Sequence, residues 1–543
     1  MKRLSALVTF IAMALLLSTL LTPPAAADKK KKQAASDASR KAMKSKAESS
    51  KVNADDRQKR TASEQTRSAA PESEEEGIDP DLPPGLSGID KESFLEKRAE
   101  SIARLRGVEP GRPFDLAARG RAIAQMERRE TELRRLAKNG FKSEAVAAAW
   151  VELGPNPIPN GQTSPSNPVS GRVTAIEIHP TNPNLVYVGT AQGGVFRSNN
   201  GGTNWTPIFD NAQSLAIGAL ALAPSNPSIL YVGTGEANGS SDSFAGVGLY
   251  RIDNADTTTG ALSDLIGPIN PVINTGASSG GSLSYNAFNG RSISKILVHP
   301  TNPAVVFVGT AGGIIGIGGD VPFNNFLPPL GLRGLFRSTN ATAAAGSVTF
   351  ERITVSQAGG TSGGVFTCFD SPCTGNRNVN DMVFEPGNPN NIVLWLNGVA
   401  GTQSVCQNPP CPPNPVVAGV PDGGIYRTTN ALASPGSSVS FAQTFSTTST
   451  STSNGRGSLA IYKTGGSAVV YAASGEDASG TSCTSASQRG ALRKSIDGGI
   501  SWSVKLTGGG GFCDTQCFYN IGLAIQPGAT PLIDKVLLGG NVT

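Results

Sequence analysis

Histidine is almost absent from this sequence of 543 residues, which contains only His179 and His299. Each histidine stands directly before a proline in the same kind of turn, which marks a structural position in a repeat. A Ser-His-Asp triad and a metal site with histidine ligands therefore find little support. We expect no metal and no other cofactor.

Charge is also scarce and is unevenly distributed. Charged residues make up 16% of the chain, and the formal net charge is +5. Most of the lysines and arginines precede residue 150, so the rest of the chain is close to neutral. The part of the chain after residue 150, which we term the body, lacks the basic surface that nucleic acids require. We therefore expect no nucleic acid partner.

Long apolar runs are confined to the N-terminus. Residues 4–21 are apolar, Lys2 and Arg3 precede them, and three alanines at 25–27 form a small-residue cleavage site. This pattern predicts a signal peptide over residues 1–27 and a protein secreted to the extracellular space or the periplasm. An uncleaved membrane anchor is the alternative, and only then would a membrane be a partner.

The seven cysteines are therefore expected in an oxidising compartment. Their spacing suggests three local disulfides, which are Cys368–Cys373, Cys406–Cys411 and Cys513–Cys517. Cys483 is left over, and its pairing with Cys513 or Cys517 stays open. None of these spacings fits a zinc site well.

The region after the signal peptide divides into two segments. Residues 28–90 have almost no large apolar side chains, so burial cannot offset the entropy of ordering them, and we predict a disordered charged linker. Residues 91–149 predict a helical segment with one apolar face. That face holds Ile123, Met126, Leu133 and Leu136. We expect it to pack on the body or on itself.

Glycine and proline are abundant, with 65 and 37 residues, and they punctuate an internal repeat. Each copy has three short apolar runs separated by Asn-Pro or glycine turns. The copies begin near residues 175, 219, 295, 382 and 459, and a sixth runs from 523 to 539. Four-stranded sheets of this kind bury both faces by stacking radially.

We therefore predict an all-β fold over residues 150–543, a β-propeller of about five complete four-stranded blades plus the start of a sixth. A linear β-solenoid is the structural alternative. We also expect that the chain carries only part of the ring and is truncated at its C-terminus.

The turn before the fourth strand carries a motif of the form Ser-x-Asp-x-Gly-x-x-Trp. The first copy has Ser198, Asn200, Gly202 and Trp205, and the fifth has Ser495, Asp497, Gly499 and Trp502. The short carboxylate or amide accepts backbone hydrogen bonds, the glycines allow positive φ, and the tryptophan is expected between the sheets. The motif is thus predicted to be a folding device.

This turn resembles the Asp-box, or BNR, repeat. Residues 150–543 are similar to secreted Asp-box propellers, including sortilin N-terminal-like proteins and BNR-repeat proteins that resemble glycosyl hydrolases. The resemblance implies the fold and leaves the activity open. Similar xyloglucanases place a catalytic Asp in a Thr-Asp-x-Gly-Gly motif, but here Ala191 stands at that position.

Glycoside hydrolysis needs a pair of carboxylates. Only weak catalytic candidates are present, and they are Glu236, Glu476 and Asp242. The Arg-Ile-Pro motif typical of sialidases is missing from the sequence. A hydrolase is therefore the less favoured of the possible functions.

Four arginines each lie just before a first-strand run, and they are Arg172, Arg291, Arg377 and Arg456. First strands line the axis of a propeller, so these side chains are expected to converge on one mouth, where guanidinium groups suit a carboxylate or a sulfate. Tyr519 is a further candidate for the rim. Alternatively, the arginines and Glu236 or Glu476 form hydrogen bonds with one another or with the backbone across the contacts between blades.

The function predicted from these features is an exported, non-catalytic propeller that binds a glycan or an extracellular protein or peptide at its loop-rich face. One alternative is a sialidase-like or xyloglucanase-like glycoside hydrolase that acts through carboxylates. The other is a sortilin-like propeller that binds peptides.

Overall fold

The computed structural model describes residues 97, 101, 117–139, 157–159, 168–238, 244–274, 284–312, 331, 333–353, 355, 378–396, 423–446, 456–475, 490–506 and 521–539. All of them belong to one unit of the chain, Leu82–Thr543. Several predicted features lie outside these residues. They are the signal peptide, the charged linker, all seven cysteines, Asp242, Arg377, Glu476 and Tyr519.

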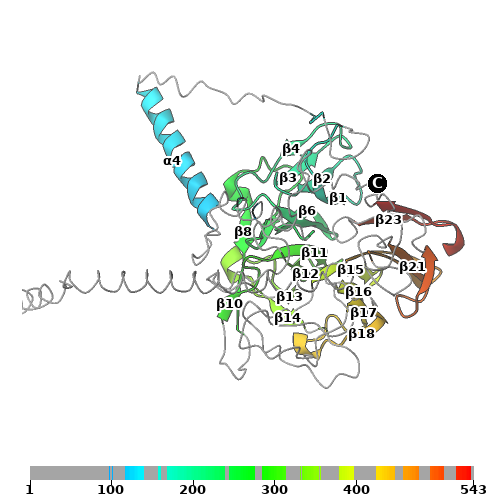
Figure 1. Ribbon diagram of the computed structural model, residues 1–543. Helices are drawn as coiled ribbons and strands as arrows, with labels where there is room; N and C mark the ends of the chain where they lie inside the picture. The colour runs from blue at the N-terminus through cyan, green and yellow to red at the C-terminus, as the bar shows by residue number, and fades with distance from the viewer. Residues whose placement is uncertain are drawn as a thin grey trace, which may run out of the picture. The chain divides into compact units, whose positions relative to one another are not determined.

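One helix, α4 (Ala118–Lys138), precedes the sheets (Figure 1). Ile123 is buried in it, and Leu133 and Leu136 are half-buried. Met126 is exposed, so the predicted apolar face is covered only in part. Among the described residues, no helix is long and apolar enough to cross a membrane.

Five four-stranded antiparallel sheets follow in chain order, and we number them as blades one to five. Blade one has β1 (Val173–Ile178), β2 (Val186–Thr190), β3 (Val195–Ser198) and β4 (Thr206–Pro207). Blade two has β5 (Ile217–Ala223), β6 (Asn226–Thr234), β7 (Leu249–Ile252) and β8 (Ile266–Ile269). Blade three has β11 (Ser292–Val298), β12 (Val306–Ala311), β13 (Gly334–Ser338) and β14 (Glu351–Ile353).

Blade four has β15 (Val379–Glu385), β16 (Asn388–Leu396), β17 (Gly424–Thr428) and β18 (Ala442–Ser446). Blade five has β19 (Gly457–Thr464), β20 (Ser467–Ser474), β21 (Ala491–Ser495) and β22 (Ser503–Leu506). A two-stranded sheet, β23 (Gly522–Gln526) and β24 (Lys535–Gly539), begins blade six. The hairpin of β9 (Val272–Asn274) and β10 (Ser284–Asn286) lies between blades two and three in the chain. Short 3-10 helices are η2 (Leu262–Asp264), η3 (Ala345–Ser347), η4 (Gly436–Ser438) and η5 (Pro531–Ile533).

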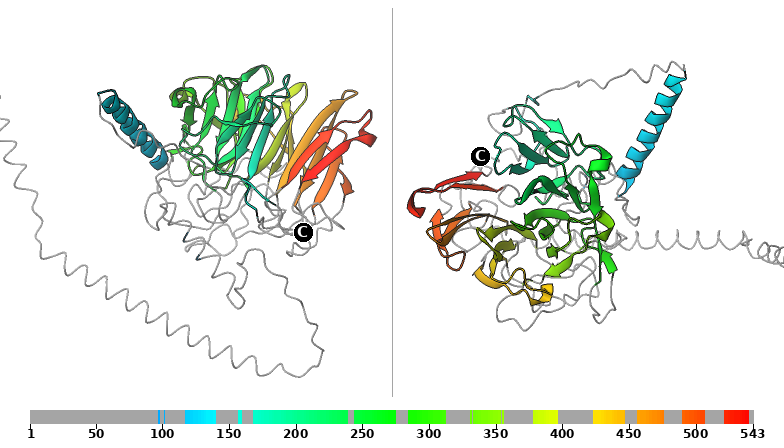
Figure 2. Two further views of the ribbon diagram at one scale, coloured as in Figure 1. Left: turned by 90° about the horizontal axis from the view of Figure 1, so that it is seen from above. Right: turned by 180° about the vertical axis from the view of Figure 1, so that it is seen from behind.

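The first strand of each blade lies against the first strand of the next, in the order β1, β5, β11, β15, β19 and β23. Figure 2 shows the sheets following one another around a common axis in this order. Within each four-stranded sheet, the strands pair in chain order from the innermost to the outermost. This arrangement is a β-propeller, which confirms the predicted all-β fold of four-stranded blades.

Neighbouring strands run antiparallel, so the connections of a blade alternate between its two ends. Connections from the first to the second strand, and from the third to the fourth, leave at one end, which we term the turn face. Connections from the second to the third strand, and from one blade to the next, leave at the other end. We term this end the long-loop face, because residues 312–333 and 397–423 connect strands there.

The contact between two successive blades, termed a seam here, depends on a small residue in the second strand of the earlier blade. A Cβ atom added to Gly189 of β2 would lie 2.5 Å from the Ile217 side chain of β5. An added Cβ at Gly309 of β12 would lie 2.7 Å from the Val379 side chain of β15. Each glycine thus leaves room for the β-branched residue that begins the next blade, and Gly233 does the same for Ile293.

In the seam between blades four and five, the large residue lies on the second strand of the earlier blade and the small residue on the first strand of the next. Trp395 of β16 stands where blades one, two and three have glycine, and the first strand of the next blade begins with Gly457. A Cβ atom added to Gly457 would lie 2.6 Å from the indole Cγ of Trp395. Each of these seams therefore pairs one large residue with one small residue, and either strand can supply the large one.

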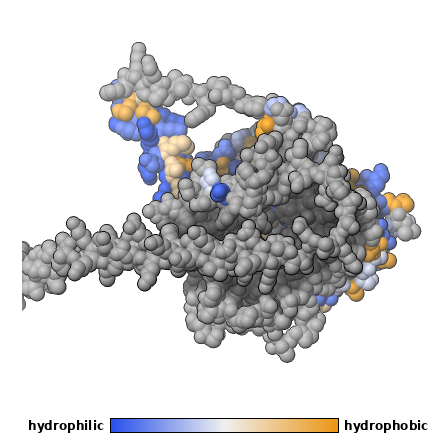
Figure 3. Space-filling model, viewed as in Figure 1, coloured by the Kyte–Doolittle hydropathy of each residue, from blue (hydrophilic) through white to orange (hydrophobic). Residues whose placement is uncertain are grey.

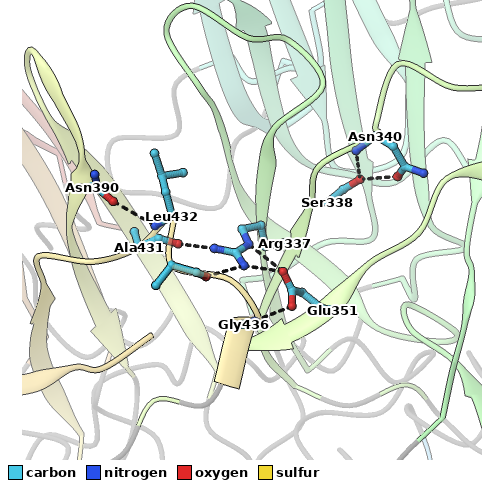
Figure 4. A network of polar contacts seen from close by, with 9 residues as sticks. Arg337, Ser338, Asn340, Glu351, Asn390, Ala431, Leu432 and Gly436 are labelled. Carbon is cyan, nitrogen blue, oxygen red and sulfur yellow. Dashed lines mark hydrogen bonds and ion pairs between the residues drawn. The ribbon is translucent and has the colours of Figure 1, made fainter. Parts of the chain in front are cut away.

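A cation on the third strand joins each blade to the next, and it is buried in every case except Arg427, which is half-buried. Arg337 of β13 donates hydrogen bonds to the carbonyl oxygens of Ala431 at 2.6 Å and Ala433 at 2.8 Å (Figure 4). It also pairs with Glu351, whose second oxygen accepts the backbone N–H of Gly436 at 2.6 Å. The equivalent cations in the other seams are Arg197, Arg251, Arg427 and Lys494, and each donates to a carbonyl oxygen of the next blade.

Candidate functional site

Arg172 and Glu236 meet at the seam between blades one and two, on the long-loop face. Arg172 lies directly before β1, Glu236 lies just after β6, and Nη2 of the guanidinium pairs with Oε1 of the carboxylate. The Glu236 side chain is 0% exposed and the Arg172 side chain is 33% exposed. Glu236 therefore holds the arginine from the buried side of the seam, while the Arg172 side chain as a whole remains partly exposed.

The backbone of residues 235–238 is held tightly in this position. Gly235 has a φ of +91°, and an added Cβ would lie 2.7 Å from the Cα of Ser292 in blade three. The Ser292 hydroxyl donates to the carbonyl oxygen of Glu236 at 2.9 Å, and the Gly235 N–H donates to the carbonyl oxygen of Ala216 at 2.7 Å. Only glycine fits at position 235, because both its conformation and its space exclude a side chain.

Arg456 reaches the same segment from blade five. Its Nη2 donates to Oδ1 of Asn238 at 2.8 Å, and its Nη1 donates to the carbonyl oxygen of Ala237 at 3.3 Å. Residues from blades one, three and five thus contact one short segment of blade two, which places that segment at the mouth of the axis. We term Arg172, Glu236, Asn238 and Arg456 the mouth cluster.

The structure brings two of the four arginines that were expected to converge to one segment of the chain. Arg172 and Arg456 come to the same segment, whereas Nε of Arg291 donates to the carbonyl oxygen of Gly331 at 2.6 Å. Arg333 was not predicted for this face. It is buried, and its Nη1 donates to Oδ1 of Asn378 at 3.3 Å.

The repeat gives no signal for Arg333. It precedes the third strand of blade three, and the equivalent residues of the other blades are Gly193, Val247, Gly423 and Gly490. Asn238 was also missed, because it follows the second strand in a connection whose length differs from blade to blade. Both residues can be found only through their contacts in the folded chain.

Charged residues also occur among the apolar first strands. Lys295 of β11 pairs with Asp381 of β15 at 2.9 Å, and the opposite charge of Asp381 raises the pKa of Lys295. The other oxygen of Asp381 accepts the backbone N–H of Leu459 in β19 at 2.8 Å. These groups join the first strands of blades three, four and five, so we assign them to the framework of the ring.

The Ser-x-Asx turns lie on the turn face, at the opposite end of the blades from the mouth cluster. Oδ1 of Asp497 accepts hydrogen bonds from the Ser495 hydroxyl at 2.6 Å and from the Ser501 N–H at 3.0 Å. Burial would raise the pKa of Asp497, but these hydrogen bonds outweigh it and lower the pKa to about 2. Ser198, Asn200 and Gly202 form the same turn in blade one.

The two tryptophans after these turns differ in their surroundings. Trp502 packs against blade four, and its Nε1 donates to the Thr444 hydroxyl at 3.1 Å. Trp205 was expected between two sheets, but it is 41% exposed. The reason is its place in blade one, which no other blade precedes within the described part of the chain.

Within the described ranges, no group of three or more His, Cys, Asp or Glu side chains could hold a metal ion. The mouth cluster contains two guanidinium groups, which are held by a carboxylate, a side-chain amide and one backbone carbonyl. Its chemistry suits the recognition of an anion.

A comparison of the sequence with protein-family models and with curated proteins gives no match. Among solved structures, an ancestral GH74 enzyme is 17% identical, with a TM-score of 0.37 over 68% of this chain. The GH74 xyloglucanase from Xanthomonas campestris is 14% identical over 63% of this chain, with a TM-score of 0.27. YCF48 bound to D1 peptide is 15% identical over 64% of this chain, with a TM-score of 0.29.

This chain covers 35% of the ancestral GH74 enzyme, 46% of the xyloglucanase and 72% of YCF48. It thus spans less than half the length of the two GH74 structures. At such identities and TM-scores, the likeness assigns no activity to this chain. The β-propeller fold is established by the four-stranded sheets of this chain and by the contacts between their first strands.

Proposed function

We propose that this protein is an exported, non-catalytic propeller of the Asp-box type that binds an acidic group of a glycan or peptide at the long-loop face. The observation that carries the proposal is the convergence of Arg172 and Arg456, from blades one and five, on residues 235–238 of blade two. Planar guanidinium groups bind carboxylate and sulfate through paired hydrogen bonds.

The burial of Glu236 and its ion pair with Arg172 support a binding function without catalysis. A glycosidase acid must reach the glycosidic oxygen, with a second carboxylate roughly 5–9.5 Å away. The Glu236 side chain is 0% exposed and is engaged by Arg172. At the position where similar xyloglucanases have a catalytic Asp, this chain has the buried side chain of Ala191.

The Asp-box assignment and export have separate support. Ser198 and Asn200 in blade one, and Ser495 and Asp497 in blade five, form turns with the hydrogen bonds that the motif requires. The apolar run at 4–21 with its small-residue cleavage site supports export.

The test is a binding screen with the full chain on arrays of sialylated, sulfated and neutral glycans, and of acidic and neutral peptides. We expect retention of acidic ligands only, and the arm that binds identifies the ligand class. Arg456→Ala should lower the affinity roughly tenfold or more, as expected for a lost charged hydrogen bond. Arg129→Ala, an exposed arginine on α4, is the matched control and should bind like the wild type.

Two results would count against this function. One is the absence of any acidic ligand on the arrays, and the other is unchanged binding by a folded Arg456→Ala variant. A screen with fluorogenic glycosides is the companion experiment, and we expect no turnover. Turnover that disappears in Glu236→Gln or Glu476→Gln would establish a glycoside hydrolase instead.

A further inference from the structure

The helix α4 carries far more positive than negative charge. Its 21 residues include seven arginines and lysines and three glutamates, which leaves an excess of four positive charges. Two of the arginines form ion pairs within the helix, and these pairs are Arg134–Glu130 and Arg135–Glu132. Arg128 and Lys138 are exposed, and neither pairs with a carboxylate in the part of the chain that the structure describes. The helix as a whole therefore attracts anions.

One side of α4 is a row of arginines. Arg121, Arg128 and Arg135 stand seven residues apart, so they lie on the same side of the helix at intervals of two turns. All three are exposed. The row extends over about 20 Å, because each residue adds about 1.5 Å to the length of a helix. Guanidinium groups bind phosphate through paired hydrogen bonds, so the row suits a surface that carries many phosphate groups.

A second side of α4 is apolar. Met126, Leu133 and Leu136 follow one another at intervals of seven and three residues, which places them together on the helix surface. Met126 is 52% exposed, and Leu133 and Leu136 are half-buried. Figure 3 shows hydrophobic residues in orange near one end of α4, beside hydrophilic residues in blue. The helix therefore presents apolar and basic side chains to solvent together.

The first two turns of α4 attach it to the connection between blades one and two. Nη2 of Arg119 donates to the carbonyl oxygen of Asp210 at 2.7 Å. A Cβ atom added to Gly120 would lie 3.0 Å from Cγ of Gln213. Ile123 is the buried residue of the helix. From Met126 onward, every residue of α4 is exposed or half-buried, so the later turns are accessible to a partner.

A helix with a basic side, an apolar side and little apolar surface overall is typical of segments that lie in the interface of a lipid bilayer. We propose that α4 docks this protein on an anionic lipid surface, with Met126 and Leu133 among the acyl chains and the arginines at the phosphate groups. A soluble polyanion would pair with the arginines but would leave Met126 in water. The combination of positive charge with exposed apolar side chains therefore favours a lipid surface.

This contact differs from the membrane anchor considered for the N-terminus. The sequence predicts a membrane partner only if the apolar run at 4–21 is retained, whereas α4 would lie on the surface without crossing it. None of the residues of α4 belongs to the mouth cluster. The proposal therefore goes beyond the binding function proposed above and does not depend on it.

Cosedimentation with lipid vesicles tests the proposal. The exported form, from residue 28 onward, is used because the apolar run at 4–21 would itself bind any bilayer. We expect binding to vesicles of phosphatidylglycerol and phosphatidylcholine in equal parts, and little binding to phosphatidylcholine alone. Binding should weaken as salt is added, because salt screens the attraction between the helix and the lipid headgroups.

Replacement of two exposed cations measures the electrostatic part. A cation near an anionic bilayer strengthens binding roughly fivefold, so Arg128→Gln combined with Lys138→Gln should weaken it roughly 25-fold. Glutamine forms helices well, so the substitutions should leave α4 intact. Lys505→Gln combined with Lys535→Gln is the matched control, since it removes the same charge from exposed positions on β22 and β24. The control should bind like the wild type.

Replacement of an apolar residue separates a lipid surface from a soluble polyanion. Met126→Gln should weaken binding to the anionic vesicles roughly tenfold, because the side chain no longer gains from burial among acyl chains. Its retention on a heparin column should equal that of the wild type, because no charge has changed. Leu133→Gln is a second variant with the same expected result, and circular dichroism confirms that both variants are folded.

Three results would overturn the proposal. The first is a wild-type chain that does not bind the anionic vesicles. The second is an equal loss of binding in the two double variants, which would mean that charge anywhere on the protein is sufficient. The third is unchanged vesicle binding in both Met126→Gln and Leu133→Gln. Together with retention on heparin, the third result would identify a soluble polyanion as the partner of α4.

Discussion

At the scale of single residues, each Ser-x-Asx turn depends on one carboxylate or amide group. Asp497 gathers the N–H groups of Ile500 and Ser501 and the hydroxyls of Ser495 and Ser501. Asn200 holds the equivalent turn with its amide oxygen, which accepts the N–H of Asn204 at 2.8 Å. Each of the two side chains supplies an oxygen that accepts hydrogen bonds, and only the carboxylate of Asp497 can be protonated.

Replacement of Asp497 tests this difference. Asp497→Ala should cost about 1 kcal/mol of the free energy of unfolding at pH 7, because the turn loses its acceptor. Asp497→Asn should cost less, because Asn200 supports the same turn in blade one. Urea unfolding at pH 7 measures both variants, and a larger loss for Asn than for Ala would contradict the role of the acceptor oxygen.

The pH dependence of the Asp497 turn has a definite sign. The folded pKa of about 2 lies below the ordinary value of about 3.9 for aspartate. The stabilisation is therefore present above pH ~4 and is lost as the pH falls through the folded pKa. The difference in unfolding free energy between the wild type and Asp497→Asn should shrink between pH 5 and pH 3. A difference that stays constant over this range would rule out titration of Asp497.

At the scale of elements, the seams between blades combine a steric rule with a polar one. The steric rule pairs a small residue with a large one, as at Gly189 and Ile217 or at Trp395 and Gly457. The polar rule sends a third-strand cation such as Arg337 to carbonyl oxygens of the next blade. Sheets that obey both rules stack with few voids and with their buried charges satisfied.

Residues Trp395 and Gly457 should be strongly coupled. Gly457→Val alone forces a side chain onto the indole and should cost roughly 3 kcal/mol or more. Trp395→Gly alone leaves a cavity and should cost about 3–5 kcal/mol. The double variant restores the pairing seen at Gly309 and Val379, so its loss should be well below the sum of the single losses. Chemical denaturation of all four proteins measures this coupling, and simple additivity would argue against the steric rule.

Arg337 should be among the residues most sensitive to truncation. Arg337→Ala leaves Glu351 and the carbonyl oxygens of Ala431 and Ala433 without their buried donor. We expect a loss of about 3–5 kcal/mol, measured by denaturant unfolding. Arg134→Ala, an exposed arginine on α4, is the control and should change stability by less than about 0.5 kcal/mol. Similar losses for the two variants would show that Arg337 does not join the blades.

At the scale of the whole molecule, residues 235–238 link blades that are not neighbours. Arg172, Ser292 and Arg456 contact this segment from blades one, three and five. In the described part of the chain, the main contacts between strands otherwise join neighbouring blades, as in other repeat proteins. The mouth cluster therefore acts on the ring as a unit, and its carboxylate has a structural role.

Glu236→Gln tests that role. The variant keeps the shape of the side chain and removes its charge, so the free energy of unfolding should fall by about 1–3 kcal/mol. Glu130→Gln removes the charge of an exposed carboxylate on α4, and it should be nearly neutral. If Glu236→Gln unfolds like the wild type, the ion pair with Arg172 does not stabilise the ring.

The sequence by itself determined the strands, their grouping into blades and the chemistry of the turns. These features are local, since period-two apolar runs and Ser-x-Asx turns depend on residues close together in the chain. Tertiary structure alone decided that Arg172 meets Glu236, that Arg456 meets Asn238, that Arg291 binds a carbonyl oxygen, and that Trp205 lies in the open. The physical reason is that these outcomes depend on which blades face one another around the axis. A repeated sequence places equivalent residues in every blade, so it does not show which of them contact a neighbouring blade.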